Sequence, residues 1–229
     1  AVAMLNNFYE IKDNILEVKN GETLELGNRK FTFHMTPMVH WPESMVTYEE
    51  ATKTLFSQDI FGGFGTLDGG IFDDQIEYDA YYLEETTRYF INIVGKYSSQ
   101  ALKALNNLGG LDIELICPVH GPIWRDNPKK IIDIYTSLAN QETIDGCVVI
   151  YGSMYGNTEY AAQALAAKLC EAGITNISLR DVSNTHVSVL IAEAFKYSNI
   201  VLASVTYNLG VYPPMQNFIE DMKLSLIHI

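Results

Sequence analysis

The strongest constraint on the fold is the segment 146–152, a continuous apolar and β-branched run that reads GCVVIYG. Such a run is typical of a central parallel strand that is covered on both faces. Helical and strand-like patterns alternate after it: a helix over 158–172, a strand over 176–180, a helix over 185–196 and a strand over 199–205. This alternation predicts right-handed crossovers in a doubly wound parallel sheet.

The first part of the chain has a different pattern. Residues 12–60 alternate polar and apolar positions in short runs, separated by Asn-Gly and Gly-Asn turn signals: NILEVKNG, ETLELGN, KFTFHMTPM, MVTYEEA and KTLFSQD. These runs predict antiparallel strands and hairpins. We expect the following elements after them: a glycine-rich loop over 61–70, helices over 76–96 and 99–107, a buried strand over 111–118, and a helix from Pro128 to about Gln141. The change of pattern predicts two domains, residues 1–142 and 145–229.

Composition excludes several classes of function. Fifteen Lys and Arg stand against 28 Asp and Glu, a formal net charge of −13, so nucleic acid and anionic membrane surfaces are poor partners. No apolar run reaches the roughly 18 residues that span a bilayer. The three cysteines, Cys117, Cys147 and Cys170, show no paired spacing. We interpret them as buried small residues in a protein of the reducing cytoplasm.

Both ends of the sequence have the pattern of a cut chain. Residue 1 lies in a helix-like run over 1–9 that has no initiating Met and no cap. A helix predicted over 214–223 runs into LSLIHI, which breaks its polar pattern. We therefore expect both domains to be truncated. We interpret 224–229 as foreign sequence and give His228 no role.

The turn after the first parallel strand has the features of an anion site. It reads YGSMYGNTE over 151–159, between the carboxyl end of a strand and the start of a helix, where backbone N–H groups favour a phosphate. Its candidate residues are Ser153, Met154, Tyr155, Gly156, Asn157 and Thr158. The turn has no lysine and no GxGxxG pattern, so it is not a P-loop or a dinucleotide fingerprint. A monophosphate site and a Ser/Thr helix cap in a tight turn are the two interpretations.

A second polar loop, SVTYNLGVYPP over 204–214, follows the third parallel strand at the same edge of the sheet. Its candidate residues are Thr206, Tyr207, Asn208 and Gly210, and the tyrosines at 207 and 212 are suited to flank a planar ring. Together, the two loops resemble the phosphate loop and the first ring loop of a flavodoxin. The resemblance implies that the ligand is FMN, with the family's other ring loop beyond residue 229.

Three residues of the first part carry metal-ligand chemistry. His40, Asp59 and His120 each end an apolar strand-like run. Imidazole and carboxylate are the ligands that non-haem iron or zinc recruits, although a histidine at a strand end also serves in packing or hydrogen bonding. We interpret His34, within a strand, and His186, near a helix start, as structural.

With the surrounding motifs HWPESM, LFSQD and CPVHGPIWR, these residues resemble the last three ligands of the flavodiiron family. That family joins a metallo-β-lactamase-like domain to a flavodoxin-like domain, in the order found here, and the resemblance covers residues 1 to about 223. It implies an α/β fold: the C-terminal part of a metallo-β-lactamase-like αββα sandwich, followed by a truncated flavodoxin-like doubly wound parallel sheet.

The resemblance also implies roles and partners. Asp59 would bridge two irons, His40 would bind the iron nearer the flavin, and His120 would bind the other. The intact protein would reduce dioxygen to water or nitric oxide to nitrous oxide, with electrons passing from a rubredoxin-like donor through FMN to the diiron centre of a head-to-tail homodimer. The family's first ligand cluster, His-x-Glu-x-Asp-His, has no counterpart here. We therefore expect the chain as given to hold iron weakly and to be inactive.

Two alternatives stay open. A zinc hydrolase shares the β-lactamase-like fold, and a non-catalytic FMN electron-transfer module attached to a degenerate scaffold would retain the second domain. The sequence does not choose between oxygen and nitric oxide as the substrate.

Overall fold

The computed structural model describes residues 2–225. Its contacts divide the chain into two compact units: unit 1 is Ala1–Thr86 with Ser99–Thr136, and unit 2 is Thr87–Ser98 with Ser137–Ile229. The division at 142 and 145 stays our proposal for the domain boundary.

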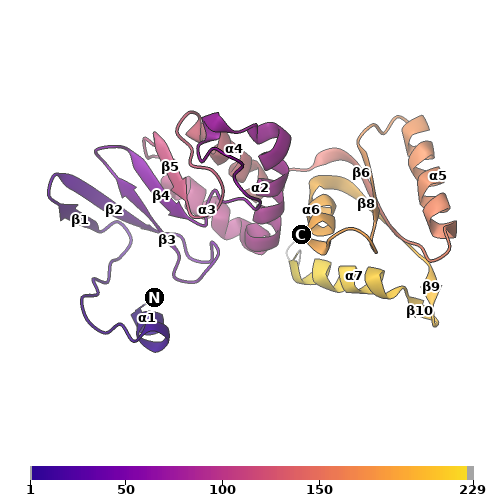
Figure 1. The fold of residues 1–229 in the computed structure, drawn as a ribbon, viewed down its shortest axis with the longest axis horizontal. Coiled ribbons are helices and arrows are strands. Elements are labelled where there is room, and N and C mark those ends of the chain that lie inside the picture. The colour runs from indigo at the N-terminus through magenta and orange to yellow at the C-terminus, as the bar shows by residue number, and fades with distance from the viewer. Residues whose placement is uncertain (1, 226–229) are drawn as a thin grey trace. The chain divides into compact units, whose positions relative to one another are not determined.

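Unit 1 is built on a five-stranded sheet in the order β1-β2-β3-β4-β5 (Figure 1). The strands are β1 (Thr23–Leu26), β2 (Arg29–Met35), β3 (Met45–Glu49), β4 (Thr54–Gln58) and β5 (Leu115–Pro118). Consecutive strands from β1 to β4 pair antiparallel, as the turn signals predict, and β5 pairs parallel with β4.

Two strand predictions need correction. The run NILEVKNG forms no strand. Asn14 has a positive φ of 60°, and the Met35 backbone N–H donates to the Asn20 side chain and not to a backbone carbonyl of this run. The predicted strand over 111–118 is extended only from Leu115 onward. In both cases the polar and apolar alternation is present, but the backbone bonds that form with a neighbouring strand lie near the end of the segment. Gly21 donates to the Phe33 carbonyl at 2.7 Å, and Glu114 donates to the Lys53 carbonyl at 3.0 Å.

Helices complete unit 1 and begin unit 2. The helix predicted over 76–96 is a succession of a π-helical turn (Tyr78–Tyr82), α2 (Leu83–Tyr89), a second π-helical turn (Phe90–Val94) and a 3₁₀ turn (Gly95–Tyr97). The other helices of this part are α1 (Val2–Tyr9), α3 (Ser98–Leu108) and α4 (Pro128–Ala139). Asn127 Oδ1 accepts a hydrogen bond from the Lys130 backbone N–H and so caps α4. The helix begins at Pro128, as the sequence predicts.

The core of unit 1 lies between its sheet and its helices. Strand residues Val46, Leu55 and Ile116 are buried, and so are Leu105 of α3 and Ile131 of α4. Figure 1 shows α3 and α4 on the same face of the sheet. This layer of helices leaves the ends of the strands uncovered, and the loops that follow β2, β4 and β5 emerge there.

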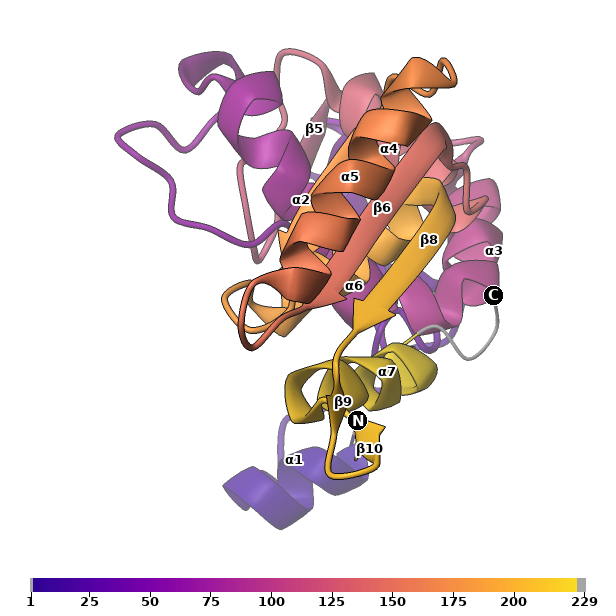
Figure 2. The same cartoon turned by 90° about the vertical axis from the view of Figure 1, so that its right-hand side faces the viewer.

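Unit 2 has the alternation that the sequence predicts. Its strands are β6 (Ile144–Gly152), β7 (Ile177–Asp181) and β8 (Tyr197–Ser204), and both neighbours pair parallel with the central β6. The helices are α5 (Asn157–Glu171), α6 (Val187–Lys196) and α7 (Pro213–Ser225). Figure 2 shows α5 on one face of β6 and α6 on the other, which explains why residues 147–150 are almost completely buried.

The predicted foreign segment is only partly described. Leu224 and Ser225 continue α7, and the remaining residues of that segment, including His228, lie outside the described residues. Over residues 2–225, no helix is long and apolar enough to cross a membrane.

The three cysteines are free thiols in different environments. Cys147 is buried in the contact between β6 and α5, and Cys117 is half-buried on β5. The prediction of burial is wrong for Cys170, which lies near the end of α5 and is exposed. Burial raises the pKa of the Cys117 and Cys147 thiols, so less reactive thiolate is present at either position.

We expect iodoacetamide at pH 8 to alkylate Cys170 at least about 10-fold faster than Cys117 or Cys147, because Cys170 is exposed, whereas burial raises the pKa of the other two thiols. Peptide mass spectrometry at a series of quench times measures the three rates. Equal rates at all three positions would show that the native protein exposes the interior of both units.

Candidate metal centre and cofactor loops

His40, Asp59 and His120 come from three loops at one edge of the unit 1 sheet. Asp59 directly follows β4 and His120 follows β5, which pairs parallel with β4, so both loops begin at the same edge. The Val119 backbone N–H donates to the Gln58 carbonyl at 2.9 Å, and this bond extends the pairing to the residues beside both side chains. His40 lies in the loop from β2 to β3 at that edge.

The two imidazoles face different oxygens of one carboxylate. His40 Nε2 lies 3.6 Å from Asp59 Oδ2, and His120 Nε2 lies 3.4 Å from Asp59 Oδ1. In proteins, metal–ligand bonds of about 2.0–2.2 Å that meet at angles near 90–110° separate two ligand atoms by roughly 3.0–3.4 Å. The His120 distance lies at the upper end of this range, and the His40 distance lies slightly above it.

No group of three His, Cys, Asp or Glu side chains between residues 2 and 225 is arranged to hold a single metal ion. Each oxygen of Asp59 has one imidazole beside it. The side chains of His40, Asp59 and His120 are 28%, 20% and 54% exposed, so small molecules can reach all three.

The loop that carries His40 is closed by two hydrogen bonds that Ser44 accepts. The Ser44 carbonyl accepts from the Thr36 backbone N–H at 2.8 Å, and the Ser44 hydroxyl accepts from the Trp41 backbone N–H at 3.1 Å. The Trp41 ring lies 6.0 Å from the His40 ring and is 54% exposed. The loop therefore presents the imidazole and an apolar indole on the same open edge.

The loop that carries His120 is held against the glycine-rich loop. Gly121 has a φ of 82°, and a Cβ at this position would lie 3.1 Å from the Gly63 backbone nitrogen, so only glycine fits without strain. Farther along, the Asp73 carboxylate accepts from the backbone N–H groups of Arg125 and Asn127, each at 2.9 Å. Sequence reasoning missed Asp73, because its partners are backbone groups about fifty positions away.

The first loop of unit 2 opens a helix without a side-chain cap. Gly156 is the N-cap residue of α5, with a φ of 86°, and its N–H donates to the Ser153 hydroxyl at 3.0 Å. No side chain caps the helix, so its first N–H groups and the positive end of its dipole are directed toward solvent or a ligand. Met154 and Tyr155 are exposed beside it.

The second loop of unit 2 is a small hairpin. Strands β9 (Thr206–Tyr207) and β10 (Gly210–Val211) are joined by Asn208 and Leu209, both with positive φ, the pattern of a type I′ turn. The Tyr207 ring is 42% exposed and Leu209 is fully exposed. Thr206, Tyr207, Asn208 and Gly210 therefore lie together on one exposed projection that leads into α7.

Tyr212 packs at the carboxyl end of β6, and its place beside a planar ring stays a prediction. A Cβ at Gly152 would lie 2.7 Å from Tyr212 Cδ1, so the ring packs on the end of β6, and its hydroxyl is 3.3 Å from the Ser183 hydroxyl. Sequence reasoning missed this loop after β7. The polar run DVSN at the end of a strand was the available signal.

Backbone strain is concentrated in these loops. Among the described residues, five of the nine non-glycine residues with positive φ lie within them: Met38, Gln58, Phe61, Asn208 and Leu209. Such conformations persist only where the surrounding structure enforces them, and they gather at functional sites.

Two family models match this chain, one in each of its two parts. A family model described as ODP family beta lactamase matches residues 1–121. The chain belongs to the ODP β-lactamase family. A flavodoxin model matches residues 149–227, so a flavodoxin domain follows the ODP β-lactamase domain in the chain. The predicted fold class is confirmed.

Three known proteins are similar to this ODP β-lactamase family member over most of its length. The structure of the rubredoxin oxygen:oxidoreductase of Desulfovibrio gigas is 34% identical, with a TM-score of 0.89 over 96% of this chain and 55% of that chain. A flavo di-iron protein mutant from Thermotoga maritima is 31% identical, with a TM-score of 0.87 over 98% of this chain and 56% of that chain. The anaerobic nitric oxide reductase flavorubredoxin of Escherichia coli is 30% identical over 91% of this chain and 44% of its own length.

These likenesses confirm the resemblance to flavodiiron proteins that the sequence motifs carry. The chain spans about half the length of the curated relatives it matches.

Proposed function

We propose that this chain belongs to a flavodiiron oxidoreductase that reduces dioxygen to water, nitric oxide to nitrous oxide, or both. The observation that carries the proposal is the Asp59 carboxylate between two imidazoles, at 3.4 and 3.6 Å, at the edge of a β-lactamase-like sheet. A flavodoxin domain in the same chain supports redox chemistry over hydrolysis, since hydrolysis has no use for a flavin. The printed names of the relatives include an oxygen and a nitric oxide reductase.

In this proposal the three metal-site residues have separate roles. Asp59 would be shared by the two irons, His40 would hold one iron, and His120 would hold the other. When bound, the irons supply the redox and Lewis-acid chemistry that a small diatomic oxidant requires. The chain itself orients the ligands, with one imidazole beside each oxygen of Asp59. The glycines at 63 and 121 allow the two loops to approach closely.

The proposed flavin site combines the two loops of unit 2. The uncapped start of α5, with Ser153, Gly156, Asn157 and Thr158, would bind the FMN phosphate, and Met154 and Tyr155 would cover it. Thr206, Tyr207, Asn208 and Gly210 of the hairpin loop would contact the ring. FMN would accept electrons from a rubredoxin-like donor. A head-to-tail homodimer would bring the flavin of one subunit to the metal centre of another.

The test is to extend the reading frame upstream of residue 1, to produce that longer chain anaerobically, and to measure iron, zinc and FMN per chain. Oxygen and nitric oxide consumption after reduction is then measured. Two irons and one FMN, with consumption of either gas, is the expected result. FMN without iron would leave a flavin electron carrier. Zinc without turnover would favour a hydrolase.

The phosphate loop gives a smaller prediction. Ser153→Ala removes the hydroxyl that accepts the Gly156 N–H and that can donate to a phosphate, at a cost of about 1 kcal/mol, or roughly a 5-fold increase in the FMN dissociation constant. Quenching of flavin fluorescence on titration measures it. Ser99→Ala is the matched control, because the Ser99 hydroxyl bonds the Gln100 side chain on α3. An unchanged dissociation constant for Ser153→Ala would exclude this residue from the site.

A further inference from the structure

The turn that carries Asp59 is strained on both sides of the carboxylate. Gln58 has a φ of 51° and Phe61 has a φ of 70°. The Ile60 N–H donates to the Ser57 carbonyl at 3.1 Å, and the Gly62 N–H donates to the Asp59 carbonyl at 3.2 Å, so two turns overlap at Asp59 and Ile60. The left-handed conformation is unfavourable for any residue that has a Cβ. Because Gln58 and Phe61 both adopt it within four consecutive positions, the turn needs support from elsewhere in the fold.

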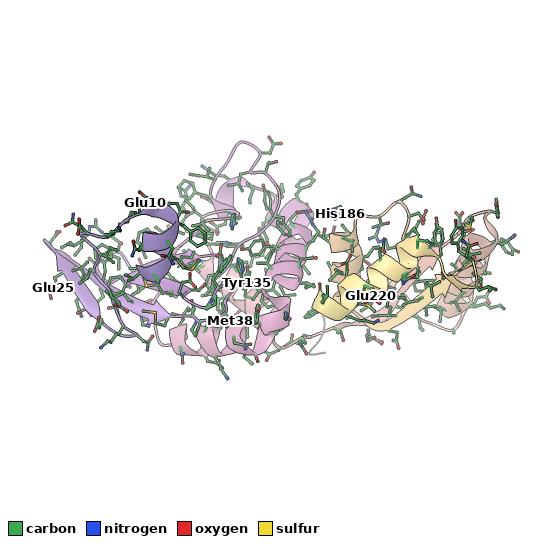
Figure 3. The ribbon with its side chains drawn as sticks, turned by 90° about the horizontal axis from the view of Figure 1, so that it is seen from below. Glu10, Glu25, Met38, Tyr135, His186 and Glu220 are labelled. Atoms are coloured by element: carbon green, nitrogen blue, oxygen red, sulfur yellow. The ribbon has the colours of Figure 1, made fainter. Side chains whose placement is uncertain are left out.

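Tyr135 of α4 supplies that support. Its hydroxyl donates to the Gly62 carbonyl at 2.7 Å, and its ring lies edge-on to the Phe61 ring, with centroids 5.1 Å apart. Tyr135 is labelled in Figure 3, among the side chains of unit 1. The side chains of Tyr135 and Phe61 are 1% and 2% exposed, so water does not compete for the bond and the strained residue cannot move outward.

We propose that Tyr135 is a positioning residue for the metal centre. By holding Gly62 and Phe61, it keeps the Asp59 turn in the one conformation that directs Oδ2 toward His40 and Oδ1 toward His120. This inference rests on the proposed function of that site. It adds a residue that lies 73 positions after Gly62 in the sequence and acts through the backbone of the Asp59 turn.

The chain offers a matched control for the loss of this hydroxyl. Tyr48 is 8% exposed, and its hydroxyl also donates to a backbone carbonyl, that of Asp112, at 2.6 Å. Asp112 precedes β5, at the edge of the sheet opposite to the candidate site. Tyr48→Phe therefore removes a bond of the same kind without any contact with the Asp59 turn.

The experiment is a titration of the metal-free protein with Co²⁺, followed by its d–d absorption spectrum, for the wild type, Tyr135→Phe and Tyr48→Phe. The phenylalanine keeps the ring that packs against Phe61, so Tyr135→Phe retains its core. We expect both variants to lower the midpoint of urea unfolding by a similar amount. Only Tyr135→Phe should raise the Co²⁺ dissociation constant, by about 10-fold, and change the d–d bands.

A double variant tests the strain directly. Gln58 is exposed, so Gln58→Gly relieves the strain at φ 51° with little loss of packing. Added to Tyr135→Phe, it should recover most of the Co²⁺ affinity, which a general loss of stability would not predict.

Three results would overturn the inference. Wild-type affinity and spectrum in Tyr135→Phe, or an equal loss in Tyr48→Phe, would show that Tyr135 contributes only to stability. A double variant no better than Tyr135→Phe would show that strain in the turn has no part. If the wild type binds no Co²⁺, the proposed metal centre itself fails, and the role of Tyr135 fails with it.

Discussion

Asp59→Asn will reduce the affinity of the protein for iron by at least about 100-fold, since loss of an outer-shell partner alone typically costs 10- to 100-fold. The reason is geometric: Asp59 is the one side chain of the three that reaches both imidazoles, so its replacement removes a ligand from both positions. Asparagine keeps the size of the side chain but provides one neutral oxygen. We expect turnover of oxygen and nitric oxide to fall with the iron content.

Iron per chain after anaerobic dialysis, measured by mass spectrometry, and gas consumption per chain are the two readouts. Asp112→Asn is the matched control, because Asp112 is an exposed aspartate that pairs with Lys53 on the surface of unit 1. FMN content should stay unchanged in both variants. Full iron content and turnover in Asp59→Asn would show that the ligands have been assigned wrongly.

Gly146→Ala will destabilise unit 2 by about 3 kcal/mol, at the upper end of the range for overpacking. A Cβ at residue 146 would lie 2.3 Å from the backbone oxygen of Asn176. That oxygen cannot retreat without loss, because it accepts the Cys147 N–H at 2.9 Å and lies beside the first paired residues of β6 and β7. The strands must separate or the hydrogen bond must break.

Thermal unfolding followed by circular dichroism checks this prediction. For a unit of this size, the expected loss corresponds to a decrease of roughly 10 °C or more in the transition that also releases FMN. Gly110→Ala is the control, since a Cβ there meets nothing within 4 Å. Equal melting of the two variants would mean that the β6–β7 contact relaxes at little cost.

The sequence predicts the elements of unit 2 better than those of unit 1. The run over 146–152 is buried on both faces, so nearly every side chain in it carries the signal of a central strand. The run over 14–21 instead alternates polar and apolar residues, yet it forms no strand, because a ladder needs a partner strand that a local pattern does not reveal. Cys170 was misjudged for a related reason: a cysteine near the end of a helix has no pattern that tells which face it occupies.

For the candidate site, too, the sequence predicts one part and the tertiary structure decides the other. The residue types and their positions at the ends of strand-like runs predict His40, Asp59 and His120 from the sequence alone, and the loops at 151–159 and 204–214 likewise. Only the tertiary structure decided that one carboxylate oxygen faces each imidazole, and that Tyr135 and Asp73 hold the neighbouring loops. The physical reason is that these contacts depend on the parallel pairing of β4 with β5 and on bonds to backbone groups, which every residue carries and no sequence pattern marks.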